Sequence, residues 1–244
     1  MQLAKSRSVI PGLTFVESID STNAELARNH ASLGDFTVLI AGEQTSGQGR
    51  AGRNWVSMPG ASIAVSFLLR PVRIEVASLV TLMAAASTHQ ALMHLFPSVS
   101  FSIKWPNDIL IAERKLAGIL AQINEDGSVV CGIGINLSHQ SLAPDTATAL
   151  SDYVITDFDE VTSAVLASMK TNWELLQSTQ GTQWLVDYVR SNCSTLGSEV
   201  RAELASGESI VGTATKITAD GHLVIQSEKE HTLAAADVWH LRKQ

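Results

Sequence analysis

The sequence has few of the residues that build disulfide frameworks, metal sites or membrane anchors. It contains two cysteines, Cys131 and Cys193, in 244 residues, and their spacing fits neither a zinc site nor a disulfide framework. The first residues contain no apolar stretch typical of a secretion signal. The longest apolar-rich run, residues 76–86, is too short to span a bilayer. We therefore expect a cytoplasmic protein in a reducing compartment, with no membrane contact.

Positive charge is also scarce. The chain has 17 Lys and Arg against 24 Asp and Glu, which gives a net charge of −7. A nucleic-acid partner normally requires a basic face, so this balance argues against nucleic acid. The 7 histidines form no cluster in the sequence, and we assign them no role. A hydrophobic content of 45% with 17% charged residues is typical of a globular protein.

Two lysines lie in a segment with the pattern of a hairpin. Lys104 and Lys115 each lie at the edge of an apolar run of β type. Pro106 should end the first strand because it has no N–H to donate, and Asn107 and Asp108 favour a turn. The pattern predicts a hairpin that brings both lysines to one end of a sheet. Two fixed cations there suit a substrate that brings two anions together.

A glycine-rich loop is expected at residues 42–55, between two apolar strands. It carries Arg50 and Arg53. Glycines let the backbone approach a ligand closely, consecutive N–H groups can form an anion-binding concavity, and arginine binds phosphate or carboxylate with two hydrogen bonds. The loop therefore predicts an anion site, with a surface loop of scattered arginines as the alternative.

Two common nucleotide-binding motifs do not explain this loop. Gln48 stands where a P-loop requires lysine. Three of its glycines match G-x-G-x-x-G, but Met58, Pro59 and Gly60 follow, and then a strand, where the dinucleotide fingerprint requires a helix.

Four segments in this order resemble the biotin protein ligases (biotin–acetyl-CoA-carboxylase ligases), in the form that lacks an N-terminal DNA-binding domain. They are residues 21–23, 42–55, 104–118 and 132–136. The family pattern usually has arginine where this chain has Gln48. A repressor role is not expected, because too few residues precede the first matched segment for a helix-turn-helix domain.

The resemblance implies an ATP-dependent ligase. The carboxylate of biotin would attack the α-phosphorus of ATP to give biotinyl-5′-AMP and pyrophosphate, and a lysine of a biotin carboxyl carrier domain would then displace AMP. ATP and Mg²⁺ are the implied co-substrates and biotin the substrate, with no permanently bound cofactor. The implied partner is the carrier domain of a carboxylase. The oligomeric state stays open, a homodimer included.

Two alternatives remain open at the sequence level. One is a lipoate or octanoate protein ligase or transferase of the same fold, against which the intact second and third segments argue. The other is a binding module that reads RNA, against which the acidic balance argues.

The resemblance also assigns residues to the site. The catalytic residues are Lys115, Arg50 and Asp108. Lys115 and Arg50 would hold the carboxylate and the α-phosphate, and Asp108 would orient or deprotonate the incoming amine. Biotin would contact Ser21, Thr22, Asn23, Gln44, Gly47, Gly49, Arg50, Trp55, Lys115, Gly118 and Gly132. ATP would contact Arg50, Arg53, Lys104, Asn107, Lys115 and Asn136. No metal ligand is assigned.

Ordinary structural roles compete with several of these assignments. Lys104 and Arg53 could be surface ion pairs. Asp108 could be a turn residue, and Trp55 a core residue at the base of its loop.

The predicted fold is α/β (α+β). Residues 1–196 should form the catalytic domain, a mixed sheet flanked by helices, and residues 197–244 a small C-terminal β-barrel, as in the family. A capping box of Thr22 and Glu25 should open one helix. The other expected elements are helices at 74–95 and 161–176 and strands at 116–123, 128–135, 199–204, 209–218, 223–227 and 238–241.

Overall fold

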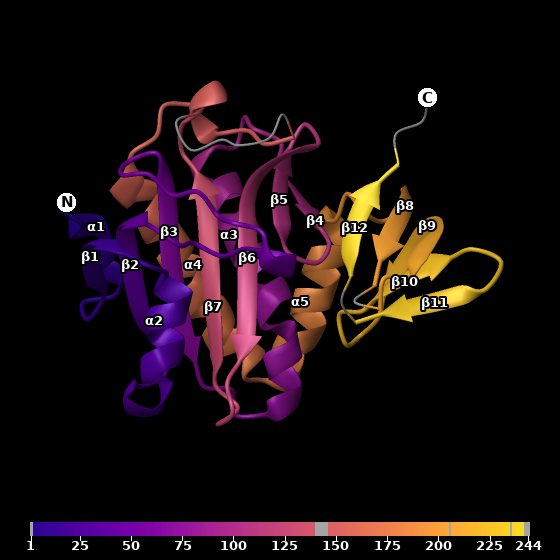
Figure 1. Cartoon of the computed structure of the whole chain (residues 1–244), viewed down its shortest axis with the longest axis horizontal. Helices are drawn as coiled ribbons and strands as arrows, with labels where there is room; N and C mark the ends of the chain where they lie inside the picture. The colour runs from indigo at the N-terminus through magenta and orange to yellow at the C-terminus, as the bar shows by residue number, and fades with distance from the viewer. Residues whose placement is uncertain (1, 140–145, 205, 235, 242–244) are drawn as a thin grey trace.

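The computed structural model of the chain describes residues 2–139, 146–204, 206–234 and 236–241. A seven-stranded mixed sheet forms the larger body, and a smaller sheet lies beside it (Figure 1). The order in the large sheet is β1-β2-β3-β7-β6-β5-β4, and among its described strands β1 and β2 alone pair in parallel. The strands are β1 (Thr14–Ile19), β2 (Thr37–Gln44), β3 (Ser62–Leu69), β4 (Ser102–Lys104), β5 (Asp108–Ile111), β6 (Arg114–Ile123) and β7 (Val129–Asn136).

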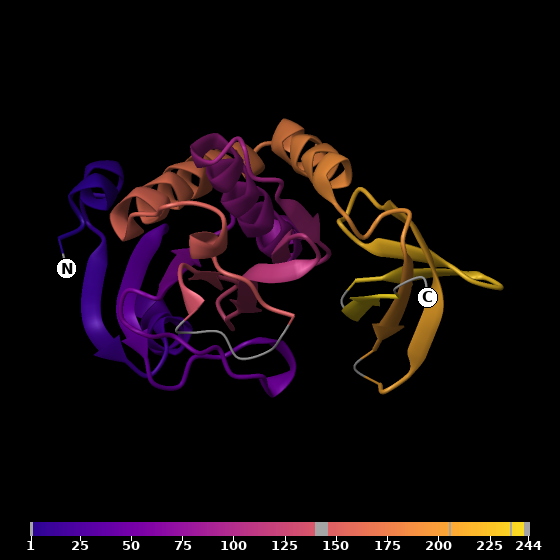
Figure 2. The same ribbon diagram turned by 90° about the horizontal axis from the view of Figure 1, so that it is seen from above.

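Helices cover the two faces of this sheet unequally (Figure 2). One face carries α3, with α4 and α5 packed against it, and the other carries α2, whose Leu26 packs with Leu39, Leu68 and Val130. The mixed sheet flanked by helices that the sequence predicts is therefore confirmed. The helices are α1 (Ala4–Val9), α2 (Thr22–Asn29), α3 (Val80–Leu95), α4 (Phe158–Leu176) and α5 (Thr179–Asn192).

The helix predicted over residues 74–95 is a 3-10 helix, η3 (Ile74–Leu79), followed directly by α3. By length and composition alone, Glu75–Leu95 could cross a membrane, but 78% of its 18-residue apolar window is buried inside the protein. Ala84, Ala85 and Ala86 are fully buried. Their small side chains let α3 pack between the sheet and α4.

The C-terminal sheet has the order β11-β10-β9-β8-β12. Its edge strands β11 and β12 do not pair with each other in the described part of the chain, so closure into the expected barrel is not confirmed. One strand, β11, was not predicted, because its polar sequence Glu-His-Thr-Leu lacks an apolar alternation. The strands are β8 (Glu199–Glu203), β9 (Ser209–Ile217), β10 (Leu223–Gln226), β11 (Glu230–Leu233) and β12 (Asp237–His240).

Trp105 fixes the C-terminal sheet against the larger body. Its indole Nε1 donates to the carbonyl of Gly221 at 2.9 Å, and its backbone N–H donates to Thr195 Oγ1 at 3.0 Å. Trp105 is buried, so both contacts are shielded from water. His240 of β12 lies 3.1 Å from the same Thr195 hydroxyl, so β12 lies beside the β4–β5 turn and its predicted lysines.

The start of α2 differs from the prediction. Ser21 is the N-cap, and its hydroxyl accepts the N–H of Ala24. The predicted capping box of Thr22 and Glu25 is wrong because both side chains have other partners. The Thr22 hydroxyl lies against Gln44, and Glu25 pairs with Arg28.

Candidate active site

Strand register aligns two rows of residues on the face of the large sheet that carries α2. Alternate residues of a strand point to the same face, so the rows lie side by side. Apart from one buried serine, they form the floor of a cavity of about 50 Å³, which we call the first cavity. The serine row is Ser66, Gly132 and Leu120, and the glycine row is Ala64, Gly134 and Gly118.

The amide of Asn23 lies across the serine row. Its Nδ2 donates to the Leu120 carbonyl at 3.1 Å, and its Oδ1 accepts a hydrogen bond from Ser66 Oγ at 2.6 Å. A Cβ at Gly132 would overlap Asn23 Oδ1. Glycine is therefore required between the two partners of this amide, and Gly132 supports the first cavity through Asn23.

Thr22 and Gln44 supply the polar groups next to this row. The backbone N–H of Thr22 donates to Gln44 Oε1 at 2.8 Å. This bond fixes which way the Gln44 amide points. Its Nε2, which has no hydrogen-bond partner among the described residues, is left for the first cavity that Gln44 lines.

The indole of Trp55 covers the glycine row. A Cβ at Gly134 would overlap the indole, and one at Gly118 would lie 3.3 Å from it. The indole Nε1 is buried and has no hydrogen-bond partner in the described part of the chain. Trp55 is thus a cavity residue, stacked where a flat ligand could lie.

The glycine-rich loop begins later than predicted, because β2 runs to Gln44. Arg50 donates to Asn107 Oδ1 at 3.1 Å and lies 3.8 Å from Asp237. Arg53 pairs with the same aspartate at 2.8 Å. Asp237 belongs to β12, so the C-terminal sheet helps to hold both arginines of the loop.

The two lysines meet at Asp108. Lys115 Nζ lies 2.6 Å from Asp108 Oδ1, and Lys104 faces Asp108 in the β4–β5 register. Burial lowers the pKa of Lys104, and the Asp108 charge partly offsets this.

The lysines come from two hairpins that share β5, where the sequence predicted one. The second turn, between β5 and β6, has no sequence signal, because Ala112 and Glu113 adopt the left-handed conformation in place of glycine.

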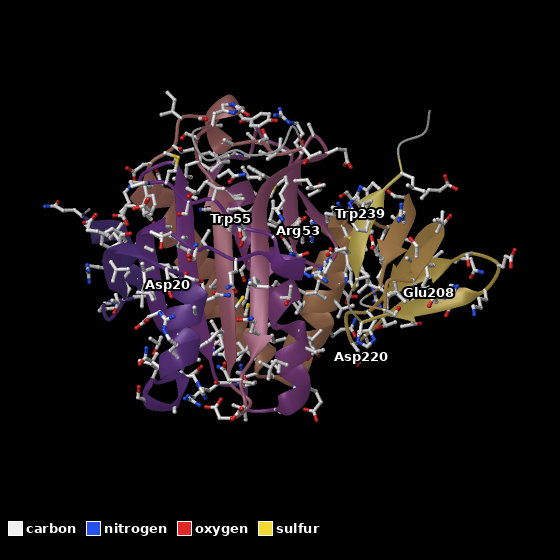
Figure 3. All side chains as sticks on the ribbon, viewed as in Figure 1. Asp20, Arg53, Trp55, Glu208, Asp220 and Trp239 are labelled. Carbon is white, nitrogen blue, oxygen red and sulfur yellow. The ribbon has the colours of Figure 1, made fainter. Side chains whose placement is uncertain are left out.

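A second cavity of about 530 Å³ adjoins the first. Its volume lies in the range of about 300–1,000 Å³ that is usual for small-molecule sites. Figure 3 shows Trp55, Arg53 and Trp239 in succession from the large sheet toward the C-terminal sheet, and all three line this cavity. Its charged residues are Arg50, Arg53, Lys104, Lys115, Asp108, Glu113 and Asp237.

Two asparagines assigned to ATP have protein partners for their amides. Asn107 accepts from Arg50 and donates to the Ile119 carbonyl at 2.9 Å. Asn136 donates to the Thr148 carbonyl at 3.0 Å, and the N–H of Thr148 donates to the carbonyl of Lys115. Asn107 therefore positions the side chain of Arg50, and Asn136 positions the backbone of Lys115 through Thr148. Their contacts with ATP stay predictions.

The residues assigned to biotin and to ATP divide between the two cavities. All residues assigned to biotin line the first cavity except Gly47, and all those assigned to ATP line the second, as does Asp108. Gly134 also lines the first cavity but was not predicted, although its spacing of two residues from Gly132 was a usable signal. Other residues that line the cavities without having been assigned include Gln48, Ala64, Asp237, Trp239 and His240.

No group of three His, Cys, Asp or Glu side chains in the described ranges could hold a metal ion. Mg²⁺ commonly keeps several waters and binds through substrate phosphates with one or two carboxylates. Asp108 beside the cationic second cavity fits that manner of binding.

Two regions of the chain match known families. Residues 15–138 match the Biotin/lipoate A/B protein ligase family, and residues 195–241 match the Biotin protein ligase C terminal domain. A biotin–acetyl-CoA-carboxylase ligase from Mycobacterium tuberculosis is 34% identical over 241 residues, which cover 94% of this chain and 89% of the relative. A ligase of the same name from Paracoccus denitrificans is 39% identical over 132 residues, covering 52% of this chain and 53% of the relative.

Solved structures are also similar. The biotin protein ligase from Aquifex aeolicus in complex with biotin and ATP superposes with a TM-score of 0.79 at 25% identity, covering 94% of this chain and 99% of that chain.

Proposed function

The chain belongs to the biotin/lipoate A/B protein ligase family, and we propose that it activates biotin with ATP and transfers it to a lysine of a biotin carboxyl carrier domain. One observation carries this proposal. Arg50 and Lys115 line both cavities. An anion in the glycine-floored first cavity and a polyanion in the cationic second cavity would therefore meet between the same two cations.

Two anions must approach each other in the first step. Unit charges about 4 Å apart repel by about 4 kcal/mol at an effective dielectric constant near 20. Lys115 and Arg50 offset this repulsion and stabilise the charge that builds on the oxygens at phosphorus. A carboxylate oxygen of biotin bonds to the α-phosphorus, and the bond from that phosphorus to the bridging oxygen of pyrophosphate breaks. Mg²⁺ bound with the ATP phosphates would supply further positive charge.

Lys115 would change partners during this step. Its ammonium lies 2.6 Å from Asp108 in the structure. When an anion binds between the cavities, the ammonium can turn toward it and leave Asp108 free. In the second step the acceptor amine attacks the carbonyl carbon of biotinyl-5′-AMP, and AMP leaves as the carbon–oxygen bond breaks. We assign Asp108 to take the proton that this amine loses.

The polar groups of the first cavity favour biotin over lipoate. A cyclic urea offers N–H donors and a carbonyl acceptor, which suit the Thr22 hydroxyl and Gln44 Nε2. The dithiolane ring of lipoate has neither group, so it would give Gln44 Nε2 no acceptor and Thr22 no ligand donor, and a polar group left unpaired when the ligand covers it costs about 1–3 kcal/mol. Competition binding of biotin against lipoate tests this choice.

A single assay tests the function. The full chain, incubated with biotin, Mg-ATP and a biotin carboxyl carrier domain, should add one biotin to one lysine and release AMP and pyrophosphate. Mass spectrometry of the carrier gives the adduct, and chromatography gives the nucleotide products. ADP and phosphate as products, or turnover without biotin, would overturn the proposal. A homodimer stays a prediction, which sedimentation can test.

A further inference from the structure

A line of buried polar groups runs from the Leu120 carbonyl toward the first cavity. A carbonyl oxygen only accepts hydrogen bonds, so the amide group 3.1 Å from it must be the NH₂ of Asn23. Asn23 Oδ1 must then face Ser66 Oγ, 2.6 Å away. The main-chain carbonyl of Leu120 therefore sets the direction in which the hydrogen bonds along this line are donated.

Three contacts along this line share two hydroxyl protons. Ser66 Oγ lies 2.6 Å from Asn23 Oδ1 and 2.7 Å from Thr22 Oγ1, and Thr22 Oγ1 lies 2.9 Å from Gln44 Oε1. Both amide oxygens are acceptors. Gln44 Oε1 already receives the backbone N–H of Thr22 at 2.8 Å, whereas Asn23 Oδ1 has Ser66 as its donor.

One arrangement gives both amide oxygens a donor and also places a proton in the 2.7 Å contact between the two hydroxyls. Ser66 donates to Asn23, and Thr22 donates to Ser66. Donation from Thr22 to Gln44 would instead leave two hydroxyl oxygens 2.7 Å apart with no proton between them, while Gln44 Oε1 already has the Thr22 N–H, so we take the first arrangement as the stable one. The proton of Thr22 then points away from the first cavity, and the free lone pair of Thr22 Oγ1 points toward it.

We propose that Ser66 is a positioning residue that makes Thr22 an acceptor toward the ligand. The inference rests on the proposed function and deepens it. Thr22 then accepts an N–H of a cyclic urea, while Gln44 Nε2 donates to its carbonyl. Ser66 is fully buried and does not line the cavity, so it acts through its partners there, Asn23, whose amide the Leu120 carbonyl also holds, and Thr22, whose proton it directs. Without Ser66, the Thr22 hydroxyl is free to turn its proton toward the ligand N–H.

Ser66→Ala tests this role, with Ser62→Ala as the matched control. Both serines lie on β3 and are fully buried, but the Ser62 hydroxyl donates to Ser57 at 3.1 Å, away from the line. Isothermal titration of the full chain should show a biotin Kd about tenfold higher for Ser66→Ala, which corresponds to about 1.4 kcal/mol. Ser62→Ala should leave the biotin Kd unchanged. In turnover, Ser66→Ala should raise the KM for biotin and leave kcat and the KM for ATP unchanged.

A double-mutant cycle separates this role from packing. Thr22→Val removes the hydroxyl at nearly constant shape, so Ser66→Ala should have no further effect on the biotin Kd in that background. A full tenfold effect there, or equal Kd values for Ser66→Ala and wild type, would overturn the inference. If Ser66→Ala fails to fold, Ser66→Cys replaces it, and its weaker donor should raise the Kd several-fold. Wild-type protein that does not bind biotin would overturn the proposed function, and the inference with it.

Discussion

Replacing Lys115 by alanine should nearly abolish the first half-reaction while leaving the fold intact. Lys115 lines both cavities, and its Nζ lies 2.6 Å from Asp108. Alanine removes the ammonium and shortens the side chain, and no backbone contact changes. The backbone N–H of Lys115 still donates to the Thr146 carbonyl, and its carbonyl still accepts from Thr148.

The structure sets the size of the two effects. Loss of a preorganised charge contact in the transition state typically costs about 2.7–4 kcal/mol, or roughly 10²–10³ in rate. The ion pair with Asp108 is partly open to solvent, because the lysine side chain is 36% exposed. Ion pairs near the surface contribute up to about 1 kcal/mol to stability. The rate should therefore fall at least a hundredfold while the free energy of unfolding falls by about 1 kcal/mol.

Biotin-dependent exchange of pyrophosphate into ATP isolates this step, because it needs no acceptor. Lys216→Ala is the matched control. Lys216 also forms an ion pair, 3.3 Å from Glu230, but it lies on β9 away from both cavities. Its exchange rate should equal that of wild type. An exchange rate for Lys115→Ala within threefold of wild type would refute the role of Lys115 in the mechanism.

Three further predictions follow from neighbouring features. Gln48, exposed at the rim of the first cavity, can only donate weak hydrogen bonds, so Gln48→Arg should slow release of biotinyl-5′-AMP roughly tenfold if the added contact is worth about 1.4 kcal/mol. Trapping of the freed intermediate with an amine measures this, and equal release would mean that position 48 points to solvent. Gly134→Ala should push the indole of Trp55 off the glycine row and destabilise the fold by about 1–3 kcal/mol. Urea unfolding measures the loss, and an unchanged midpoint would show that the indole does not rest there. Burial raises the pKa of Cys131 to about 12, so its thiol should stay protonated and unreactive toward Ellman's reagent at pH 8 until the protein unfolds. Because the unfolded thiol ionises at lower pH, it should also make stability fall as pH rises toward 12, and rapid labelling of folded protein would contradict the burial.

The sequence predicts the parts of the site that lie within one segment each. The glycine–arginine loop and the Lys104 to Lys115 segment combine special backbone residues with charges, and these signals are local. The helix start was read one residue late, because Ser21 and Thr22 can both cap a helix. Propensity cannot tell which of the two has a better partner elsewhere, and here Gln44 is that partner for Thr22.

The rest of the site depends on contacts between distant segments. Asp237 and Trp239 reach the second cavity because the C-terminal sheet docks through Trp105. The sequence pattern of β12 alone does not indicate that its residues line the second cavity. Ser66 reads as an ordinary strand serine until the register places it opposite Gly132, under the amide of Asn23.

The indole of Trp55 also has a kinetic consequence. It rests on the glycine row and leaves a first cavity of about 50 Å³, well below the roughly 300 Å³ of the smaller ligand pockets. Biotin can then enter only those molecules in which the indole has swung away. The apparent affinity is reduced by the fraction of such molecules, and the association rate should level off with rising biotin at the opening rate of the loop. The movement of the Trp55 indole would therefore limit the association rate of biotin, whatever the affinity of the opened cavity.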